Sequence, residues 1–350
     1  GIAGCTALIV GALGIRDSIR NVADNQFDSI MVFDYDISFS ENQSKEDRDN
    51  FIKLYEDDLS ECVFICTEEI EATRGDVLKK ATVVATDDSN INKVISLHLN
   101  EVEVAYPSFG AVSISNSLAR EFKVQPGDTI SINIGPTETA VAYVEAVFEN
   151  YVGNYILMTG RTYSELFGQE PEYKNAYAST QNKDIYAVSA LLLNEDSITS
   201  VRVNNDTRIM VNNMMMSLDA IIWLVIACAG ALSFVVIYNL NNINITERNR
   251  EIATLKVLGF YQNEVGAYVF RETITLTFIG AILGMGLGKL LHMFVMGEIT
   301  VEMVYFKEQI FPVSYFIAFV FTFAITFIVN WMLRRKIDVI NMAESLKSVE

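Results

Sequence analysis

The sequence predicts an α-helical membrane protein with an inserted α+β domain outside the membrane. Three observations support this fold class. Four apolar runs flank one long stretch of ordinary soluble composition. The 350 residues are 51% hydrophobic, with a mean hydropathy of +0.25. Positive charges gather beside only some of the runs. The expected order is one truncated helix, the external domain, and then three transmembrane helices.

The first apolar run, Gly1 to Ile15, is too short to cross a hydrocarbon core of about 30 Å, which needs about 20 helical residues. A signal peptide would carry a charged start and a small-residue cleavage site, and neither is visible. We therefore expect a truncated transmembrane helix, and we expect the chain to be the C-terminal part of a longer protein.

Three later runs, Leu218 to Leu240, Ala267 to Met296 and Pro312 to Leu333, are each long enough to span a bilayer. Buried core helices are the alternative, which we disfavour because three such runs fit no ordinary globular core. The expected segments are a truncated helix at 1–16, an external domain at 17–216, transmembrane helices at 217–240, 267–292 and 312–333, a cytoplasmic segment at 241–266, an external loop at 293–311, and a cytoplasmic tail at 334–350.

Basic residues in short loops indicate the orientation, because they stay on the cytoplasmic side of a membrane. They lie between the second and third runs and after the fourth, at Arg248, Arg250, Lys256, Arg334, Arg335, Lys336 and Lys347. The number of helices between these two segments places both on the same side. We expect a multi-pass protein of the cell membrane, in contact with lipid, with residues 17–216 outside the cell.

The net charge is concentrated in the predicted external domain. Residues 21–216 hold 14 lysines and arginines against 32 aspartates and glutamates, a balance of −18, and the rest of the chain is neutral. Like charges repel, so this balance argues against nucleic-acid binding. A solvated, self-repelling surface explains the charge more simply than a specific cation site.

The sequence offers no catalytic, cofactor or metal site. The histidines are His98, in a predicted alternating strand from Ile95 to Leu99, and His292, far away in the sequence. Cys62 and Cys66 fall in another predicted strand, where positions four apart are separated by about 13 Å, too far for a disulfide. A helix there would bring the two thiols within reach. No zinc-ligand spacing is present.

The external domain alternates between strand and helix patterns, which indicates a mixed α+β fold. We expect a helix at Asn116 to Phe122 with Ser115 as its N-cap, and a turn at Val124 to Asp128 that leads into an antiparallel pair. The predicted strands are Ile30–Ser38, Cys62–Thr67, Ala81–Thr86, Thr129–Ile134, Thr139–Phe148, Tyr155–Thr159 and Ile185–Leu193, with further helices at Lys45–Leu59 and Tyr163–Phe167.

Gly280, Gly284 and Gly288 recur every four residues in the third apolar run. This spacing places a glycine strip on one helix face, where another backbone can pack closely. The neighbouring Gly288-Lys289 is no phosphate-binding loop, because the flanking glycine and hydroxyl residues of that motif are missing.

The stretch from Asn244 to Gly259 continues the second run as an amphipathic helix. Its charged residues are spaced to pair at i and i+3, as Glu247 with Arg250 and Arg248 with Glu251. Another face carries Ile245, Ile252 and Leu255, and Gly259 suits a helix C-terminus. A helix on the membrane surface and a docking helix for a cytoplasmic partner both remain open from this pattern.

At these residues the sequence resembles the C-terminal domain of FtsX-like permeases, which include the MacB-like and lipoprotein-release transporters. The resemblance covers about residues 217–335. It rests on the order and spacing of Glu247, Arg248, Arg250, Glu251, Ile252, Ala253, Leu255, Lys256, Leu258, Gly259, Val265, Glu272, Gly280, Gly284 and Gly288. More weakly, Val112 to Ala119 and Val124 to Ile130 are similar to the MacB-like external domain.

The resemblance implies a permease subunit of an ABC transporter. A separate cytoplasmic ATPase subunit would dock under the loop between the second and third helices and move the external domain by transmitted force. The ATPase-docking residues would be Glu247, Arg248, Arg250, Glu251, Ile252, Leu255, Lys256, Leu258 and Gly259. Further implied partners are a preceding permease repeat or a second permease copy. No enzymatic activity and no cofactor are implied for this chain itself.

Two functions remain open under this resemblance. The first is export or extraction of a peptide, a lipoprotein or a hydrophobic compound. The second is an FtsX-type mechanical coupler that regulates a cell-wall hydrolase outside the cell or a sensor kinase. The size of the domain at 17–216 favours transport.

Overall fold

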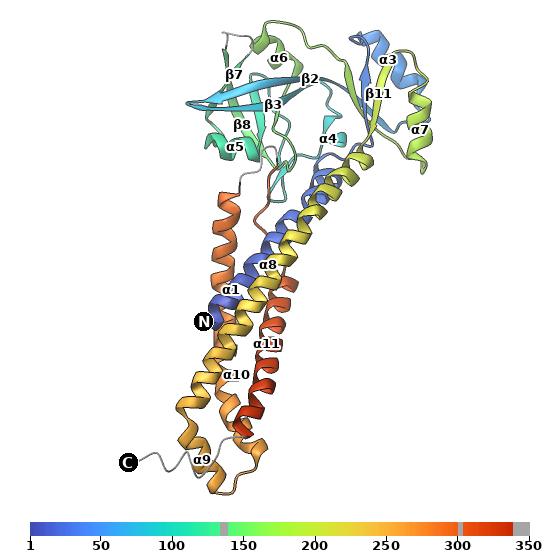
Figure 1. Cartoon of the computed structure of the whole chain (residues 1–350). Coiled ribbons are helices and arrows are strands. Elements are labelled where there is room, and N and C mark those ends of the chain that lie inside the picture. Colours follow the sequence, from blue (N-terminus) through green and yellow to red (C-terminus); the bar gives the residue numbers. More distant parts are fainter. Residues whose placement is uncertain (134–138, 300–303, 339–350) are drawn as a thin grey trace. The chain divides into compact units, whose positions relative to one another are not determined.

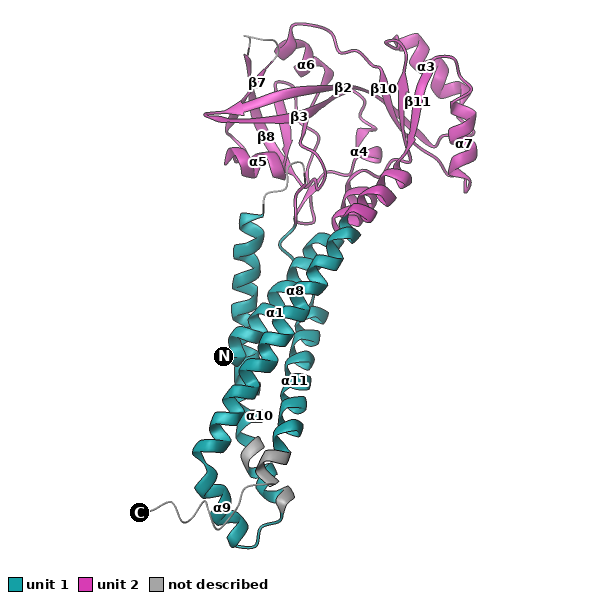
Figure 2. Cartoon of the chain, in the orientation of Figure 1, with its two compact units in different colours: residues 1–20, 215–299, 307–350 teal, residues 21–214, 300–306 magenta. Residues whose placement is uncertain are grey.

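The chain folds into two compact units, which Figure 2 distinguishes by colour. The computed structural model describes residues 1–133, 139–299 and 304–338, with side chains except those of 262, 263, 269, 270 and 335–338. The helical unit comprises residues 1–20, 215–299 and 307–350, and the α+β unit comprises residues 21–214 and 300–306. The α+β unit is thus an insertion between helices, as the sequence predicts.

Four helical segments of the described chain are long and apolar enough to cross a membrane (Figure 1). The first begins with α1 (Ile2–Arg20) and continues through α2 (Val22–Asp24) and a π-helical turn, η1 (Asn25–Ile30). The others are α8 (Asn204–Glu247), α10 (Gln262–Glu298) and α11 (Pro312–Asp338), and a short helix, α9 (Asn249–Val257), lies between α8 and α10.

The helices are longer than their apolar runs. Helix α1 continues beyond residue 16 because its polar residues find partners: Arg16 lies 3.8 Å from Asp219, and the Asp17 carboxylate accepts the amide N–H of Phe311 at 3.0 Å. Helix α8 has 44 residues and is therefore about 66 Å long, more than twice a hydrocarbon core. Helix α10 includes residues 293–298, which the sequence assigned to a loop.

The glycines of α10 face the backbone of α1. A Cβ atom added at Gly284 would lie 2.7 Å from the carbonyl oxygen of Ala3 and 2.5 Å from the Cβ of Thr6. At Gly288 it would lie 3.0 Å from the carbonyl oxygen of Ala7. Only glycine allows so close an approach. In lipid this matters because helices gain little from the hydrophobic effect there and associate through packing instead.

Polar side chains inside the helical unit bond to one another across helices. The Asn241 amide donates to the side-chain oxygen of Asn330 at 2.8 Å, and the Thr273 hydroxyl donates to Asn241 at 3.2 Å. Thr6 and Thr322 share a hydrogen bond of 3.2 Å. All five residues are buried, so these bonds link α1, α8, α10 and α11.

The described strands of the α+β unit form one nine-stranded sheet in the order β11-β1-β10-β2-β3-β9-β6-β8-β7. An additional pairing of β2 with β7 closes six of them into a barrel. The strands are β1 (Tyr35–Phe39), β2 (Glu61–Arg74), β3 (Val77–Ala85), β6 (Ala111–Ser115), β7 (Thr129–Asn133), β8 (Thr139–Phe148), β9 (Tyr155–Met158), β10 (Asn175–Ser179) and β11 (Ile198–Val203). A separate pair is formed by β4 (His98–Leu99) and β5 (Val102–Glu103).

Strand β2 connects two hydrophobic cores. Its first residues, Glu61 to Ile65, pair with β10, and its later residues, Cys66 to Arg74, pair with β3. One core fills the barrel, and the other lies on the β11-β1-β10 side. The helices beside these strands are α3 (Lys45–Leu54), α4 (Ile91–Val94), α5 (Asn116–Phe122), α6 (Gly160–Phe167) and α7 (Ile185–Leu192).

Most predicted elements of the α+β unit are confirmed, and four predictions are wrong, wholly or in part. Residues Ile185–Leu193 form helix α7, because alternation over so short an apolar run does not distinguish strand from helix. The segment from Ile30 becomes a strand only at Tyr35, after the π-helical turn. His98 lies in a strand of two residues, and Ser115 precedes α5 without a side-chain capping bond.

We predict that Gly284→Val lowers the free energy of unfolding of the helical unit by about 1–3 kcal/mol, because the new side chain meets the backbone of α1. Thermal unfolding of the detergent-solubilised chain measures this loss. Gly286→Val is the matched control, since a Cβ there meets no atom within 4 Å. Equal melting temperatures for the two variants would contradict the close approach of α1 and α10.

Candidate functional site

The segment between α8 and α10 is a helical hairpin with one break. Helix α8 ends at Glu247, Arg248 has φ −96° and ψ 15°, and α9 begins at Asn249. The helical hydrogen bonds continue through the break, since the amide of Ile252 donates to the carbonyl of Arg248 at 3.0 Å. The predicted continuation of α8 as a helix is therefore confirmed, with a local distortion.

The predicted apolar stripe of this segment is covered by the protein itself. Ile245 and Ile252 are 2% and 1% exposed, and Leu255 packs beside them. Their neighbours come from α1, α8, α10 and α11, namely Ile2, Ile237, Val265, Ile325, Val329 and Leu333. In this structure Ile252 and Leu255 therefore pack α9 against the helical unit, and a role for them in docking the ATPase stays a prediction.

Arg248 bonds across the hairpin. Its guanidinium donates to the carboxylate of Glu272 on α10 at 3.0 Å, where a pairing with Glu251 was expected. Both groups are partly exposed, so the pair stabilises the hairpin only weakly but fixes the direction of the Arg248 side chain. The remaining charged docking candidates lie on the outer side of the segment: Glu247, Arg250 and Glu251 are exposed, and Lys256 is half-buried.

Gly259 ends α9 in a Schellman motif, which confirms its predicted place at a helix C-terminus. The amide of Gly259 donates to the carbonyl of Lys256 at 3.1 Å, and the amide of Phe260 donates to the carbonyl of Leu255 at 3.2 Å. Gly259 has φ +90°, a left-handed conformation that costs a residue with a Cβ about 1–2 kcal/mol.

Four large apolar side chains are exposed around this turn. Val257, Leu258, Phe260 and Tyr261 form what we call the apolar tip, and Leu258 and Tyr261 are 69% and 78% exposed. Tyr261 also precedes α10 as its N-cap, and its amide donates to the Glu264 carboxylate at 2.9 Å. Phe260 and Tyr261 were missed from the sequence. The sequence feature that could have identified them is a pair of aromatic residues directly after the glycine that ends the helix.

No group of three or more metal-ligating side chains is found among the residues that the structure describes. The His98 ring lies 3.7 Å from the Glu149 carboxylate, which already accepts the Tyr151 hydroxyl at 2.8 Å. Cys62 and Cys66 lie on β2 as free thiols. Burial raises the pKa of Cys62 to about 12 and also raises the pKa of Cys66, so neither is a reactive thiolate at neutral pH.

Residues 223–338 match the family model of the FtsX-like permease C-terminal domain. The matched residues include most of α8, together with α9, α10 and α11. They contain both the hairpin with the apolar tip and the glycines that face α1. No curated protein matches the chain at a significant level.

About half of the chain is similar to each of three solved structures, at low identity. The extracellular domain of the noncanonic ABC-type transporter YknZ from Gram-positive bacteria is 18% identical, with a TM-score of 0.32, over 48% of this chain and 98% of that one. The periplasmic region of MacB from Actinobacillus actinomycetemcomitans is 10% identical, with a TM-score of 0.34, over 53% and 94%. A putative lipoprotein from Bacillus anthracis is 9% identical, with a TM-score of 0.28, over 49% and 98%.

We predict that Gly259→Val accelerates amide hydrogen exchange at the end of α9 by roughly 5–30-fold, because the strained turn opens more often. Hydrogen-exchange mass spectrometry of the full chain in micelles measures it on peptides that contain residues 255–260. Gly259→Asn is the matched control and should change exchange less, since asparagine tolerates this conformation. Unchanged exchange in the valine variant would contradict the motif.

Proposed function

We propose that the chain is the permease subunit of an ABC transporter and that a separate cytoplasmic ATPase subunit docks on its apolar tip. The match of residues 223–338 to the FtsX-like permease domain carries this proposal. ATP hydrolysis takes place in the partner subunit, and this chain converts it into movement of the α+β unit. The transported substrate is a peptide, a lipoprotein or a hydrophobic compound, exported or extracted from the membrane.

The exposure of the apolar tip supports it as the docking surface. Leu258, Phe260 and Tyr261 project from a turn held by backbone hydrogen bonds, so a partner meets them already ordered. Exposed apolar groups of this size mark interaction sites, and aromatic anchors carry much of the binding energy of protein interfaces. The exposed charges of Glu247, Arg250 and Glu251 would border the contact and set its orientation.

Helix α8 offers a direct route for the transmitted force. It begins at Asn204, immediately after strand β11, and continues without interruption to Glu247 at the hairpin. The Asn204 amide donates to the carbonyls of Met31 and Phe33, both at 2.8 Å, so the helix is anchored in the α+β unit at its first residue. Movement of the hairpin by an ATPase is thereby delivered to strand β11.

The orientation that we propose places the α+β unit outside the cell and the hairpin in the cytoplasm. One contact supports the placement of these two parts on opposite sides of the membrane, independently of loop charge. The segment between α10 and α11 returns to the α+β unit, where the Tyr305 amide donates to the Tyr151 carbonyl at 2.9 Å and Val304 pairs with Val152. That segment and the α+β unit therefore lie on one side of any membrane that α10 and α11 cross.

A preceding permease repeat or a second permease copy completes the transporter in this proposal. The helices offer such a partner large apolar faces, since only 22% of the apolar part of α10 and 33% of that of α8 are buried within this chain. Lipid covers the apolar faces that this second permease part does not contact.

We predict that Leu258→Glu combined with Tyr261→Glu weakens binding of the cognate ATPase by roughly 30-fold or more, because two exposed anchors become charged. Co-purification and titration of the ATPase with the detergent-solubilised chain measure the affinity. Val102→Glu, at a residue that is 68% exposed on the α+β unit, is the control and should leave binding unchanged. ATPase binding of normal affinity to the double variant would overturn the docking surface.

We predict that a membrane-impermeant maleimide reacts with Glu56→Cys on intact cells and with Thr254→Cys only after permeabilisation. Both positions are exposed, and they lie on the α+β unit and on α9. The unsubstituted chain gives the background from its four free cysteines. Labelling of Thr254→Cys on intact cells would reverse the proposed orientation.

A further inference from the structure

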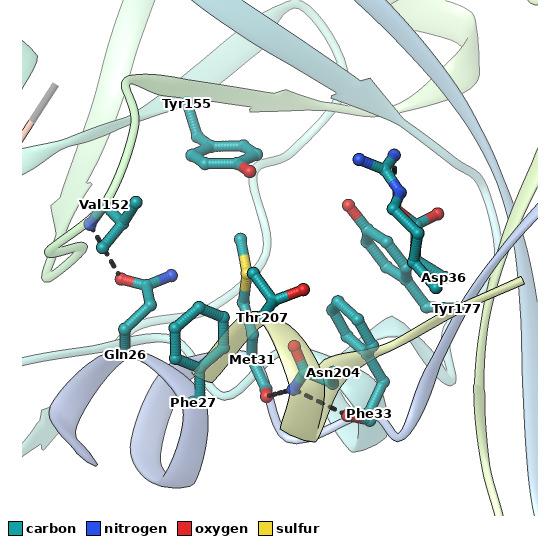
Figure 3. A pocket seen from close by; sticks show the side chains of 11 residues that line it. Gln26, Phe27, Met31, Phe33, Asp36, Val152, Tyr155, Tyr177, Asn204 and Thr207 are labelled. Carbon is teal, nitrogen blue, oxygen red and sulfur yellow. Dashed lines mark hydrogen bonds and ion pairs between the residues drawn. The ribbon is translucent and has the colours of Figure 1, made fainter. Parts of the chain in front are cut away.

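The α+β unit contains a cavity of about 140 Å³ where its two cores meet (Figure 3). One wall comes from the β11-β1-β10 side, with Asp36, Tyr177 and Arg202. The opposite wall comes from β9 and the loop before it, with Tyr155 and Val152, and the floor comes from η1 and the residues after it. The cavity is therefore built by three separate parts of the unit.

The floor of the cavity is apolar and aromatic. Phe27, Met31 and Phe33 line it, and Figure 3 shows them below Tyr155. The ring of Phe33 stacks on that of Tyr177, with 4.0 Å between centroids and 5° between planes. Such stacked rings form a rigid, flat surface that suits an aromatic or alkyl group.

Two phenol groups face this space. Tyr177 is only 5% exposed, and in Figure 3 its hydroxyl, like that of Tyr155, is directed into the cavity. Among the residues that the structure describes, neither hydroxyl has a hydrogen-bond partner. Burial and the nearby Asp36 carboxylate raise the pKa of Tyr155 to about 12, so it keeps its proton. A hydroxyl that lines a cavity without a protein partner is able to bond to a ligand or to water there.

The other polar groups of the floor are already used within the protein. The Gln26 side-chain oxygen accepts the amides of Tyr151 and Val152, at 2.7 and 3.1 Å. The Asn204 amide is held by two backbone carbonyls. The polar contacts left for a ligand are thus concentrated at the tyrosines and at the charged residues beside them.

The cavity continues into a second, more polar space of about 290 Å³ that shares Asp36, Tyr155, Tyr177 and Arg202 with it. Glu68 and Glu69 of β2 line this second space, together with Thr67, Thr82 and Asn175. Asp36 forms an ion pair of 2.9 Å with Arg202, whose side chain is 69% exposed. The carboxylate of Glu68 accepts the Tyr163 hydroxyl on the other face of β2, so two carboxylates, of Asp36 and Glu69, share this space with one guanidinium. The mouth therefore has an excess of negative charge.

We propose that this cleft binds a small amphipathic cation, an amine or guanidinium carried on an aromatic or alkyl group. The apolar group lies on Phe27, Met31 and Phe33, and the cation lies between Asp36 and Glu69. The ring faces of the tyrosines add a cation–π attraction, and their hydroxyls gain a partner. This proposal concerns ligand binding by the α+β unit and holds whether or not the chain couples to an ATPase.

An anionic ligand is the competing possibility, because Arg202 is exposed. Its guanidinium is already paired with Asp36, and an anion would also meet Glu69. Over the whole unit the charge is strongly negative, which attracts cations and repels anions before contact. Both arguments favour the cation.

The test is titration of the full chain in detergent with 2-phenylethylamine, followed by calorimetry, with 3-phenylpropionate as the anion of similar shape. A ligand of this size should bind the cleft with a Kd of roughly 1 mM. The amine should bind and the acid should not. Asp36→Asn with Glu69→Gln should weaken amine binding by roughly 3–10-fold, because both carboxylates beside the cation are lost.

Glu56→Gln with Asp57→Asn is the matched control, since it removes two exposed carboxylates of the same unit outside the cleft. It should leave the affinity unchanged. Tyr177→Phe should weaken binding by roughly fivefold through the lost hydroxyl, which tests the inner part of the cleft separately. Equal weakening by the cleft and control pairs, equal binding of the acid, or no saturable amine binding below roughly 10 mM would each overturn the proposal.

Discussion

The close approach of α1 to α10 depends on two glycines of α10, which have no side chain to hold the helices apart. Gly284 and Gly288 leave room for the carbonyl oxygens of Ala3 and Ala7, and any larger residue would push the two helices apart. The apolar part of the first helical segment is 72% buried, far more than that of the other three. Because α1 also packs on α11, the other buried contacts of the helical unit depend on the spacing between α1 and α10. The hydrogen bond between Thr6 and Thr322, for example, forms only when α1 is packed against α10 and α11.

The hairpin between α8 and α10 has buried and exposed apolar side chains within one short segment. Ile252 joins the core of the helical unit, whereas Leu258 and Tyr261, a few residues later, are mostly exposed. The Schellman turn at Gly259 produces this change, because the left-handed residue ends the helix and redirects the chain. Since the inner face is occupied by the protein's own core, a partner is left with the tip and the outer charges.

The two units also differ in how they place charge. Residues 21–216 carry the whole net charge of −18, and most of that charge is a solvated surface. Within the cleft, however, Asp36 and Glu69 lie beside aromatic rings and one guanidinium. The cleft therefore differs from the rest of the acidic surface. Only the cleft offers a ligand both an apolar and a charged contact.

The sequence by itself determined the class of the protein. Apolar length gave the candidate membrane helices, glycine spacing gave the packing face of α10, and alternation gave most strands of the α+β unit, because these features depend on residues near one another in the chain. Tertiary structure decided the rest. The burial of Ile252, the pairing of Arg248 with Glu272, the return of Tyr305 to Tyr151, and the cleft formed by Tyr155, Tyr177 and Asp36 all join residues distant in sequence. A local pattern records that a face is apolar or charged, but only the folded chain determines what covers that face.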